Sequence, residues 1–356
     1  MTMLLLTIFP EQLTALRLSG LVLAALLIAF AVVRRSRLTN AEIILIFIVA
    51  VGLVIVSGTE LADRLLSALS FERGNGGRIL GLAVLAILFL FALSLRSLHV
   101  AQRNTREISG VLEGIASEQF LAAGNRERFA DRIGIVIPAF DEAENIGFVL
   151  DRIPDEVCGV PTAVLVVDDG SRDGTAEVAA EHGAVVARHV MNRGGGAALR
   201  TGYRLMSDSG AKLVVTLDAD GQHRPSEMDR LVAPVLSGEV DVAHGSRVLG
   251  EAERGQFARE AGIVFFNRVV SLITRTKVTD CSNGYRAVRT EVLPLLVLRQ
   301  EQFHTSEFLI EALKKGVPAV EVPVTVEPRL HGQSKKPAVV RYGIGFANAI
   351  MRTWLR

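Results

Sequence analysis

The sequence of 356 residues is poor in cysteine and has almost no net charge. Its two cysteines, Cys158 and Cys281, form no CxxC pair, so the sequence suggests neither a zinc site nor a disulfide framework. Free thiols suit the reducing cytoplasm. The formal net charge is +1, which gives no electrostatic reason to expect nucleic acid as the main partner.

Two common phosphate-binding signatures are also missing. A Rossmann dehydrogenase needs GxGxxG after its first strand, because the glycines let the backbone approach a pyrophosphate. Here the first expected strand, residues 133–137, is followed by PAFDE, which has no glycine. The GxxxxGK(S/T) loop is absent too, and no Ser-His-Asp or Cys-His arrangement can be proposed. The sequence therefore disfavours a Rossmann dehydrogenase and offers no obvious general base.

Long apolar runs are present, and nearly all of them precede residue 100. They predict membrane-spanning helices over about 14–33, 41–57 and 79–98, because about 20 apolar residues cross a bilayer. Arginines follow the first and the third run, which places these two ends in the cytoplasm. We therefore expect a transmembrane domain over 1–107 in a multi-pass protein of the plasma membrane, with the rest of the chain on the cytoplasmic side.

Two further segments have the pattern of amphipathic helices. Apolar residues recur at helical spacing from Ile108 to Ile115, which predicts a linker helix over 108–124. At the end of the chain, an apolar run carries arginines and precedes Trp354, which predicts a C-terminal helix over 336–356. This helix is expected at the membrane interface, although packing on the core is the alternative.

After Asp131 the pattern changes to short β-branched runs that alternate with helical segments. Such alternation is typical of a parallel sheet wrapped by helices. The runs predict strands over residues 133–137, 163–167, 185–187, 213–217 and 240–243.

Acidic motifs follow three of these strands. In parallel sheets, ligands bind beyond the carboxyl ends of the strands, so the residues just after each strand are the candidates for a site. The motifs are PAFDE at 138–142, VDDGSRDGT at 167–175 and LDADGQH at 217–223.

Through these motifs, the region from about 132 to 332 resembles glycosyltransferase family 2, of the dolichol-phosphate mannose synthase type. PAFDE stands where that family has Pro-Ala-Tyr-Asn-Glu, VDDGSRDGT matches almost letter for letter, and DADGQH matches its Asp-x-Asp-x-Gln metal motif. Further motifs match in the same order, namely GSR at 245–247, TDCSNGYRAVR at 279–289 and PRLHGQSK at 328–335.

The resemblance implies an α/β fold of the GT-A type, a nucleotide-sugar transferase domain, over 131–335. An all-α transmembrane domain of three helices is expected before it. That earlier part of the chain resembles a small membrane-protein family of unknown function. The alternative is that its helices are generic membrane anchors.

By the resemblance, the third motif binds a metal ion, Mg²⁺ or Mn²⁺. A departing nucleotide diphosphate gains negative charge, and these hard cations take oxygen ligands from carboxylates and phosphates. We therefore assign Asp218, Asp220 and Gln222 to the metal and expect Asp218 and Asp220 to be the catalytic residues. The alternative is an ordinary acidic loop after a strand.

The resemblance also assigns residues to the base, ribose and diphosphate of the donor. Carboxylates suit this task because they accept stronger hydrogen bonds than neutral groups do. The DDGS run can at the same time cap the helix that follows it. The expected donor-binding residues are Pro138, Phe140, Glu142, Asp168, Asp169, Asp218 and Ala219.

The absence of a general base fits a phosphate acceptor, whose oxygen is already ionised near neutral pH. Arginines should then mark the acceptor, since a planar guanidinium suits phosphate oxygens. The resemblance gives this role to Arg247, Arg259 and Arg329. The alternative for each is a solvated surface arginine.

The sequence thus predicts an inverting, metal-dependent hexosyltransferase that moves a sugar from a nucleotide diphosphate to a polyprenyl (dolichol-type) phosphate at the cytoplasmic membrane face. The donor is expected to be of the GDP-mannose or UDP-glucose type. Two alternatives stay open: a GT-A transferase that acts on a glycolipid or polysaccharide, and a non-catalytic membrane scaffold partner. A hydroxyl acceptor would demand a carboxylate base, and a scaffold would have little need for an intact metal motif. A homo-oligomer is left open as well.

Overall fold

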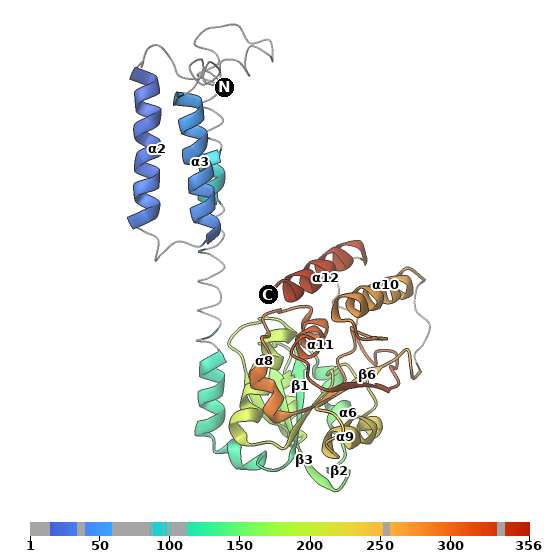
Figure 1. The fold of residues 1–356 in the computed structure, drawn as a ribbon. Coiled ribbons are helices and arrows are strands. Elements are labelled where there is room, and N and C mark those ends of the chain that lie inside the picture. The colour runs from blue at the N-terminus through green and yellow to red at the C-terminus, as the bar shows by residue number, and fades with distance from the viewer. Residues whose placement is uncertain are drawn as a thin grey trace. The chain divides into compact units, whose positions relative to one another are not determined.

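A computed structural model divides the chain into two compact units, Met1–Glu107 and Ile108–Arg356 (Figure 1). The described residues of the first unit are helical, and the second unit is a sheet wrapped by helices. The structure describes residues 15–33, 40–58, 86, 88–94, 96–97, 100, 110, 113–251, 257–332 and 339–356.

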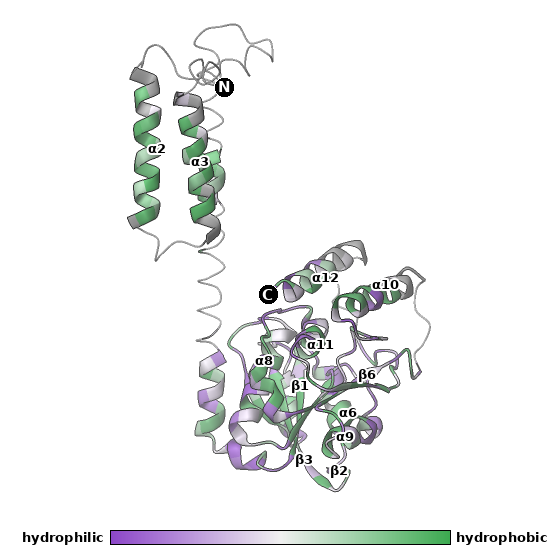
Figure 2. Ribbon diagram, in the orientation of Figure 1, coloured by the Kyte–Doolittle hydropathy of each residue, from purple (hydrophilic) through white to green (hydrophobic). Residues whose placement is uncertain are grey.

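The first unit contains two packed helices, α2 (Ala15–Val33) and α3 (Asn40–Gly58). Gly20 allows their close approach, because a Cβ at this position would lie 2.0 Å from Oγ of Ser57. Most of the remaining surface of both helices is apolar (Figure 2). The side chains buried between the helices are Ala24, Val49, Ala50 and Leu53.

These two helices correspond to those predicted over 14–33 and 41–57. Of the third predicted helix, over 79–98, the structure describes only parts, including the helical residues 88–94. Among the helices in the described part of the chain, none has both the length and the apolar character that crossing a membrane requires. The prediction of three membrane-spanning helices is therefore not confirmed.

The second unit is built on an eight-stranded sheet with the order β2-β3-β1-β5-β7-β6-β8, and β4 also pairs with β3. Strand β1 runs parallel to β3 and to β5. Strand β6 runs parallel to β8, whereas β7 is antiparallel to both of its neighbours, β5 and β6. The predicted parallel pairing is thus confirmed for β1, β3, β4 and β5, whereas β2 and β7 are antiparallel additions. The strands are β1 (Ile133–Ala139), β2 (Glu156–Val157), β3 (Val160–Asp168), β4 (Val185–Arg188), β5 (Leu213–Thr216), β6 (Val242–Ser246), β7 (Arg286–Arg289) and β8 (Ala319–Pro323).

Helices cover both faces of this sheet. Ile135 of β1 joins a buried cluster with α6, α7 and α9, whereas the next residue, Val136, joins a second cluster with α8 and α11. This follows from the alternation of side chains along a strand. The helices are η2 (Asn125–Arg128), α6 (Ala143–Leu150), α7 (Thr175–Glu181), α8 (Gly195–Ser209), η3 (Pro225–Glu227), α9 (Met228–Leu236), α10 (Phe257–Thr274), η4 (Thr290–Leu295), α11 (His304–Lys314) and α12 (Val339–Trp354).

Most described residues of the two predicted amphipathic segments are helical, namely residues 113–122 in the first and α12 in the second. Residues 113–122 form a helix before η2, and Phe120 packs on Phe129 with ring centroids 5.8 Å apart. α12 packs with α10 and α11 in a third buried cluster that includes Phe346 and Ile350. The C-terminal helix therefore has one face on the core of the second unit.

The register of the sheet gathers the acidic motifs. Ala139 at the end of β1 lies opposite Asp168 at the end of β3. On the other side of β1, Val136 lies opposite Thr216, the last residue of β5. Because these strands are parallel, all three motifs leave the sheet at the same edge, which is where such sheets bind ligands.

Candidate functional site

Asp168 ends β3 and is fully buried. Its Oδ1 accepts a hydrogen bond from the N–H of Ser171 at 3.0 Å, which holds the turn after the strand. Its Oδ2 lies 3.1 Å from Nε of Arg188, the last residue of β4. Arg188 therefore balances the charge of Asp168. Motif reading does not identify this arginine, because only the pairing of β4 with β3 brings it to the site.

Asp169 supports the glycine-rich start of α8. Its carboxylate accepts hydrogen bonds from the backbone N–H groups of Arg193 at 3.0 Å and Gly194 at 2.6 Å. Nδ1 of His189 lies 2.7 Å from the same carboxylate. These bonds give Asp169 a structural role, and its direct contact with a donor stays a prediction.

Glu142 stands at the start of α6 and is held from several sides. Its backbone N–H donates to Oγ1 of Thr175 at 2.9 Å, and its Oε2 accepts a hydrogen bond from Nδ2 of Asn145 at 2.7 Å. Its Oε1 pairs with Nη2 of Arg329. The other Nη of Arg329 lies 3.7 Å from Oδ2 of Asp220. Arg329 thus links the first acidic motif to the third.

The third motif forms a tight loop after β5. The N–H of Asp218 donates to Nδ1 of His223 at 3.2 Å, and the N–H of Gln222 donates to Oδ1 of Asp220 at 3.2 Å. Asp218 lies close to Gly284, where a Cβ would come within 2.9 Å of its Oδ1. Burial, followed by the charge of Asp218, raises the pKa of Asp220.

These residues fit a divalent cation. Two neighbouring carboxylates, one of them largely buried, are stabilised when a cation binds between them. The side-chain amide of Gln222 donates to the carbonyl of Glu327 at 3.0 Å through its nitrogen, and its oxygen is the atom that suits a hard cation. Groups of three or more His, Cys, Asp or Glu that could hold a metal are absent from the described residues. Mg²⁺ is commonly held by one or two carboxylates and substrate phosphates, so Asp218 and Asp220 suffice.

The remaining predicted donor residues lie at the same edge of the sheet. Pro138 and Phe140 are half-buried at the end of β1, and Ala219 is buried between the two aspartates of the third motif. The ends of β1, β3 and β5 thus bring the predicted donor set together. Their individual roles stay predictions.

Arg247, one of the predicted acceptor arginines, is engaged in an internal ion pair. Its Nε donates to Oδ2 of Asp280 at 2.6 Å, and its Nη2 donates to Oγ of Ser282 at 2.9 Å. Burial alone would raise the pKa of Asp280, but the charge and hydrogen bonds of Arg247 outweigh it and lower that pKa. Nε2 of His244 lies 2.7 Å from the Asp280 carbonyl oxygen. Burial, together with the charge of Arg286, lowers the pKa of His244 to about 4.

The other two predicted acceptor arginines lie elsewhere. Arg259 is on α10, and its side chain lies outside the described residues. The guanidinium of Arg329 lies between Glu142 and Asp220, and its Nε donates to the carbonyl of His331 at 2.8 Å. Arg247 and Arg329 therefore have different carboxylate partners, and those of Arg329 are residues predicted to bind the donor and the metal.

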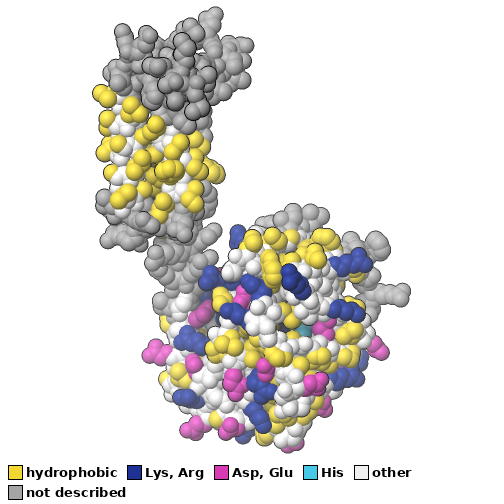
Figure 3. Space-filling view, in the orientation of Figure 1, with side chains coloured by type: hydrophobic (Ala, Val, Ile, Leu, Met, Phe, Trp, Pro, Cys, Tyr) yellow, Lys and Arg dark blue, Asp and Glu magenta, His cyan; other side chains and the backbone are white. Residues whose placement is uncertain are grey.

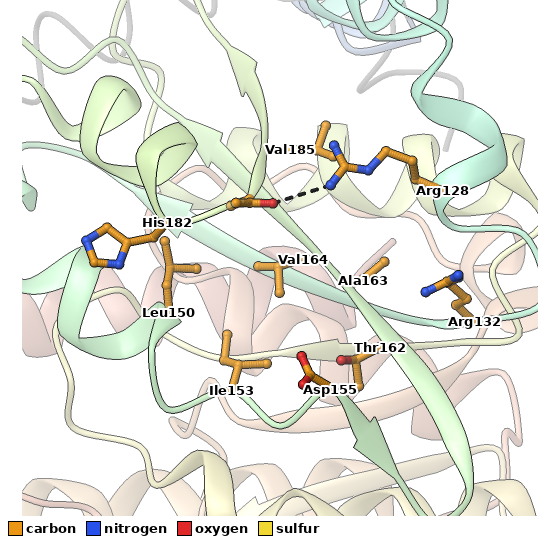
Figure 4. Close-up of a pocket in the computed structure, with 12 residues that line it drawn as sticks. Arg128, Arg132, Leu150, Ile153, Asp155, Thr162, Ala163, Val164, His182 and Val185 are labelled. Carbon is orange, nitrogen blue, oxygen red and sulfur yellow. Dashed lines mark hydrogen bonds between the residues drawn. The ribbon is translucent and has the colours of Figure 1, made fainter.

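A cavity of about 380 Å³ lies in another part of the second unit (Figure 4). Its lining combines apolar side chains, such as Leu150, with Arg128 and Arg132. It lies where the strands begin, since Arg132 precedes β1 and Val185 is the first residue of β4. The acidic motifs leave the opposite ends of these strands, so this cavity is not part of the candidate site.

Known proteins share the motif-bearing part of this chain. The family described as glycosyl transferase family 2 matches residues 134–295. A polyprenol monophosphomannose synthase of Mycolicibacterium smegmatis is 34% identical over 220 residues, which cover 58% of this chain and 82% of that protein. An undecaprenyl-phosphate mannosyltransferase of Micrococcus luteus is 30% identical over 217 residues, which cover 57% of this chain and 87% of that protein.

A solved structure also resembles the second unit. It is glucosyl-3-phosphoglycerate synthase from Mycobacterium tuberculosis, in complex with Mn²⁺, UDP and glucosyl-3-phosphoglycerate. The TM-score is 0.51 at 22% identity, and the match covers 65% of this chain and 82% of that chain. At this identity the likeness speaks for the fold alone, and it supports the predicted GT-A-type α/β fold.

Proposed function

This chain belongs to glycosyl transferase family 2, and from that premise we propose that it transfers a sugar from a nucleotide diphosphate to a polyprenyl phosphate. The names of the two relatives support a lipid phosphate as the acceptor. The observation that carries the proposal is the place of Arg329, a phosphate-binding type of side chain, among the carboxylates of the first and third motifs. The donor is of the GDP-mannose or UDP-glucose type, and the anomeric carbon is inverted.

On the donor side, Glu142 and Asp168 would accept hydrogen bonds from the base and ribose. Both carboxylates are buried or nearly so, which strengthens such bonds because water competes less. Each also has an arginine beside it, Arg329 for Glu142 and Arg188 for Asp168, so neither buries an unbalanced charge.

At the leaving group, Asp218, Asp220 and Gln222 would hold a divalent cation, which supplies positive charge to the departing nucleotide diphosphate. His223 keeps their loop in place. Its Nδ1 accepts the N–H of Asp218, and its ring stacks on Tyr285 with centroids 5.1 Å apart. The protein thus presents a preformed metal loop.

On the acceptor side, the phosphate needs no general base, because its oxygen is ionised near neutral pH. The chain has to position this oxygen in line with the anomeric carbon and exclude competing water. Arg329 offers charge-assisted hydrogen bonds for that purpose. Arg247 would assist from the loop between β6 and α10, where Asp280 fixes its Nε.

A lipid acceptor requires contact with a membrane, and α10 and α12 offer apolar side chains for it. Phe265 and Leu272 of α10 are exposed, as are Met351 and Trp354 of α12. Figure 3 shows hydrophobic side chains gathered along α12. Tryptophan at the edge of an apolar helix face is typical of interfacial helices. We place the enzyme at the cytoplasmic face of the plasma membrane, where nucleotide sugars are available.

Transfer of labelled sugar tests the proposal. The full chain in detergent is incubated with radiolabelled GDP-mannose, UDP-glucose or UDP-N-acetylglucosamine and Mn²⁺ or Mg²⁺, with polyprenyl phosphate as acceptor. We expect one donor to label the lipid, and the label to disappear with EDTA. The matched control is the polyprenol without its phosphate, which should stay unlabelled. Labelling of the free polyprenol, or of a glycolipid or polysaccharide alone, would contradict the phosphate acceptor.

A second arm of the experiment examines the residue that carries the proposal. Arg329→Ala should lower kcat/KM for the lipid phosphate by about 10- to 150-fold, the loss expected for one or two charge-assisted hydrogen bonds. Arg329→Lys should recover only part of this loss, because an ammonium keeps the charge without the two-pronged geometry. Wild-type kinetics in Arg329→Ala would remove Arg329 from the acceptor site.

A further inference from the structure

Residues 325–332, which we call the closing segment, connect β8 to the candidate site. At one end the segment is joined to the metal loop, because the N–H of Glu327 donates to the carbonyl of Gln222 at 2.8 Å. The amide nitrogen of Gln222 donates in return to the carbonyl of Glu327 at 3.0 Å. In between, Leu330 covers Gly221, where a Cβ would lie 2.4 Å from the leucine Cδ1.

The other end of the closing segment is bound by Asn145 of α6. Oδ1 of Asn145 accepts the N–H of His331 at 3.0 Å, and its Nδ2 lies 3.3 Å from the His331 carbonyl oxygen, to which it donates. The same Nδ2 donates to Oε2 of Glu142 at 2.7 Å. Asn145 is 3% exposed, so these protein partners replace water around its amide.

The carbonyl of His331 is also the group that orients Arg329. Nε of Arg329 donates to this oxygen at 2.8 Å, while its Nη2 pairs with Glu142. Asn145 and Arg329 therefore share two partners, the His331 carbonyl and the Glu142 carboxylate. A side chain that fixes both partners fixes the place of the guanidinium.

We propose that Asn145 is a positioning residue for acceptor transfer, which keeps the closing segment docked so that Arg329 reaches the lipid phosphate. The inference rests on the proposed function. When a donor occupies Glu142, Arg329 loses that partner, and the bonds of Asn145 to the His331 backbone then hold the base of the arginine in place. An amide suits this position, because its oxygen accepts the His331 N–H while its nitrogen carries two N–H groups, for Glu142 and for the His331 carbonyl. Aspartate would accept the His331 N–H but would repel Glu142.

A double-mutant cycle with Arg329 tests this role. Asn145→Ala should lower kcat/KM for polyprenyl phosphate by about tenfold in the wild-type background, mainly through KM for the lipid. In the Arg329→Ala background, Asn145→Ala should lower kcat/KM for polyprenyl phosphate by less than about twofold, because Asn145 acts by positioning this arginine. Asn145→Asp should behave like Asn145→Ala.

The matched control is Asn267→Ala. Asn267 is also a buried asparagine that clamps a backbone, since its Oδ1 accepts the N–H of Cys281 at 2.9 Å and its Nδ2 donates to the carbonyl of Thr279. Among the described residues it shares no hydrogen-bond partner with Arg329, so the activity lost in Asn267→Ala should be the same in both backgrounds.

Hydrogen exchange separates this inference from the proposed function. The His331 amide should exchange faster in Asn145→Ala than in wild type, while amides of β1 should not change. If the wild type fails to label polyprenyl phosphate, the proposed function is wrong, and the exchange result still decides whether Asn145 holds the segment. The positioning role would be overturned if Asn145→Ala lowered kcat/KM equally in the wild-type and Arg329→Ala backgrounds. It would also be overturned if the His331 amide exchanged as slowly in Asn145→Ala as in the wild type. If Asn145→Ala does not fold, Asn145→Asp takes its place in the cycle.

Discussion

Removing Arg247 should destabilise the protein far more than removing a surface arginine. Asp280 is fully buried and accepts hydrogen bonds from Nε of Arg247 at 2.6 Å and from its backbone N–H at 3.1 Å. Arg247→Met keeps an unbranched stem of similar reach but leaves the carboxylate without this cation. Losing one partner of a buried ion pair costs about 3–5 kcal/mol. We expect about 3 kcal/mol, the lower end, because Ser282 still donates to Asp280 through its hydroxyl at 3.1 Å.

Urea unfolding at pH 7.5 measures this loss of stability. The matched control is Arg289→Met, which breaks a pair with Asp241 at 2.8 Å between side chains that are 31% and 34% exposed. Ion pairs of this exposure contribute about 0–1 kcal/mol, so the control should unfold at nearly the wild-type midpoint. Equal losses in the two arginine variants would refute the argument.

The pH dependence gives a second check on the same pair. In the wild type, the pKa of Asp280 lies below its ordinary value of 3.8. The ionised Asp280, paired with Arg247, therefore stabilises the folded protein above pH 3.8, and this stabilisation is lost in stronger acid. In Arg247→Met, burial raises that pKa, so protonation relieves the buried charge as the pH falls. The difference in stability between variant and wild type should therefore shrink from pH 7.5 to 4.5. If the difference in unfolding free energy did not change with pH, the loss in Arg247→Met would come from packing and not from the charge of Asp280.

Two further predictions concern His244 and Asp220. The pKa of His244 is lowered from 6.5 to about 4, so its neutral form stabilises the fold above pH 6.5, and roughly 3 kcal/mol is lost as the pH falls to 4. His244→Gln, which cannot take up this proton, should lose less stability between pH 7 and 4.5 in urea unfolding, and an equal loss would contradict the assignment. Asp220→Asn should keep the wild-type circular dichroism but nearly abolish Mn²⁺-dependent transfer, because an amide is a poorer ligand for a hard cation. Full turnover would disprove the metal role.

The grouping of the candidate site residues at the strand ends could be predicted from the sequence because it depends on local patterns. Short β-branched runs mark the strands, and the acids that follow them are at the carboxyl ends whatever the order of strands. The placement of Ala139 beside Asp168 then requires only that β1 and β3 are neighbours. The apolar runs likewise locate α2 and α3, although hydropathy alone does not make them membrane spans.

The partners of the site residues could not be predicted, because they depend on contacts between distant parts of the chain. Arg247 pairs with Asp280 because the antiparallel β7 lies between β5 and β6 and returns the TDCSN segment to the end of β6. Arg329 pairs with Glu142 because the closing segment folds back from β8 to α6. A motif match identifies an arginine as suited to bind phosphate, but it does not identify the carboxylate with which that arginine pairs.

The contacts of Arg329 predict that donor and metal binding will affect acceptor binding. Its Nη2 pairs with Glu142, and its Nη1 lies within ion-pair distance of Oδ2 of Asp220, at 3.7 Å, so the two carboxylates compete with an acceptor phosphate for the guanidinium. A donor on Glu142 and a cation on Asp220 would each replace one of these contacts and free the guanidinium. We therefore expect Mn²⁺ and a nucleotide diphosphate together to tighten binding of polyprenyl phosphate about tenfold, which corresponds to about 1.4 kcal/mol. Calorimetry with and without them measures the change, and Arg329→Ala should abolish it. Equal affinity of the wild type in both conditions would mean that Arg329 does not couple the two subsites.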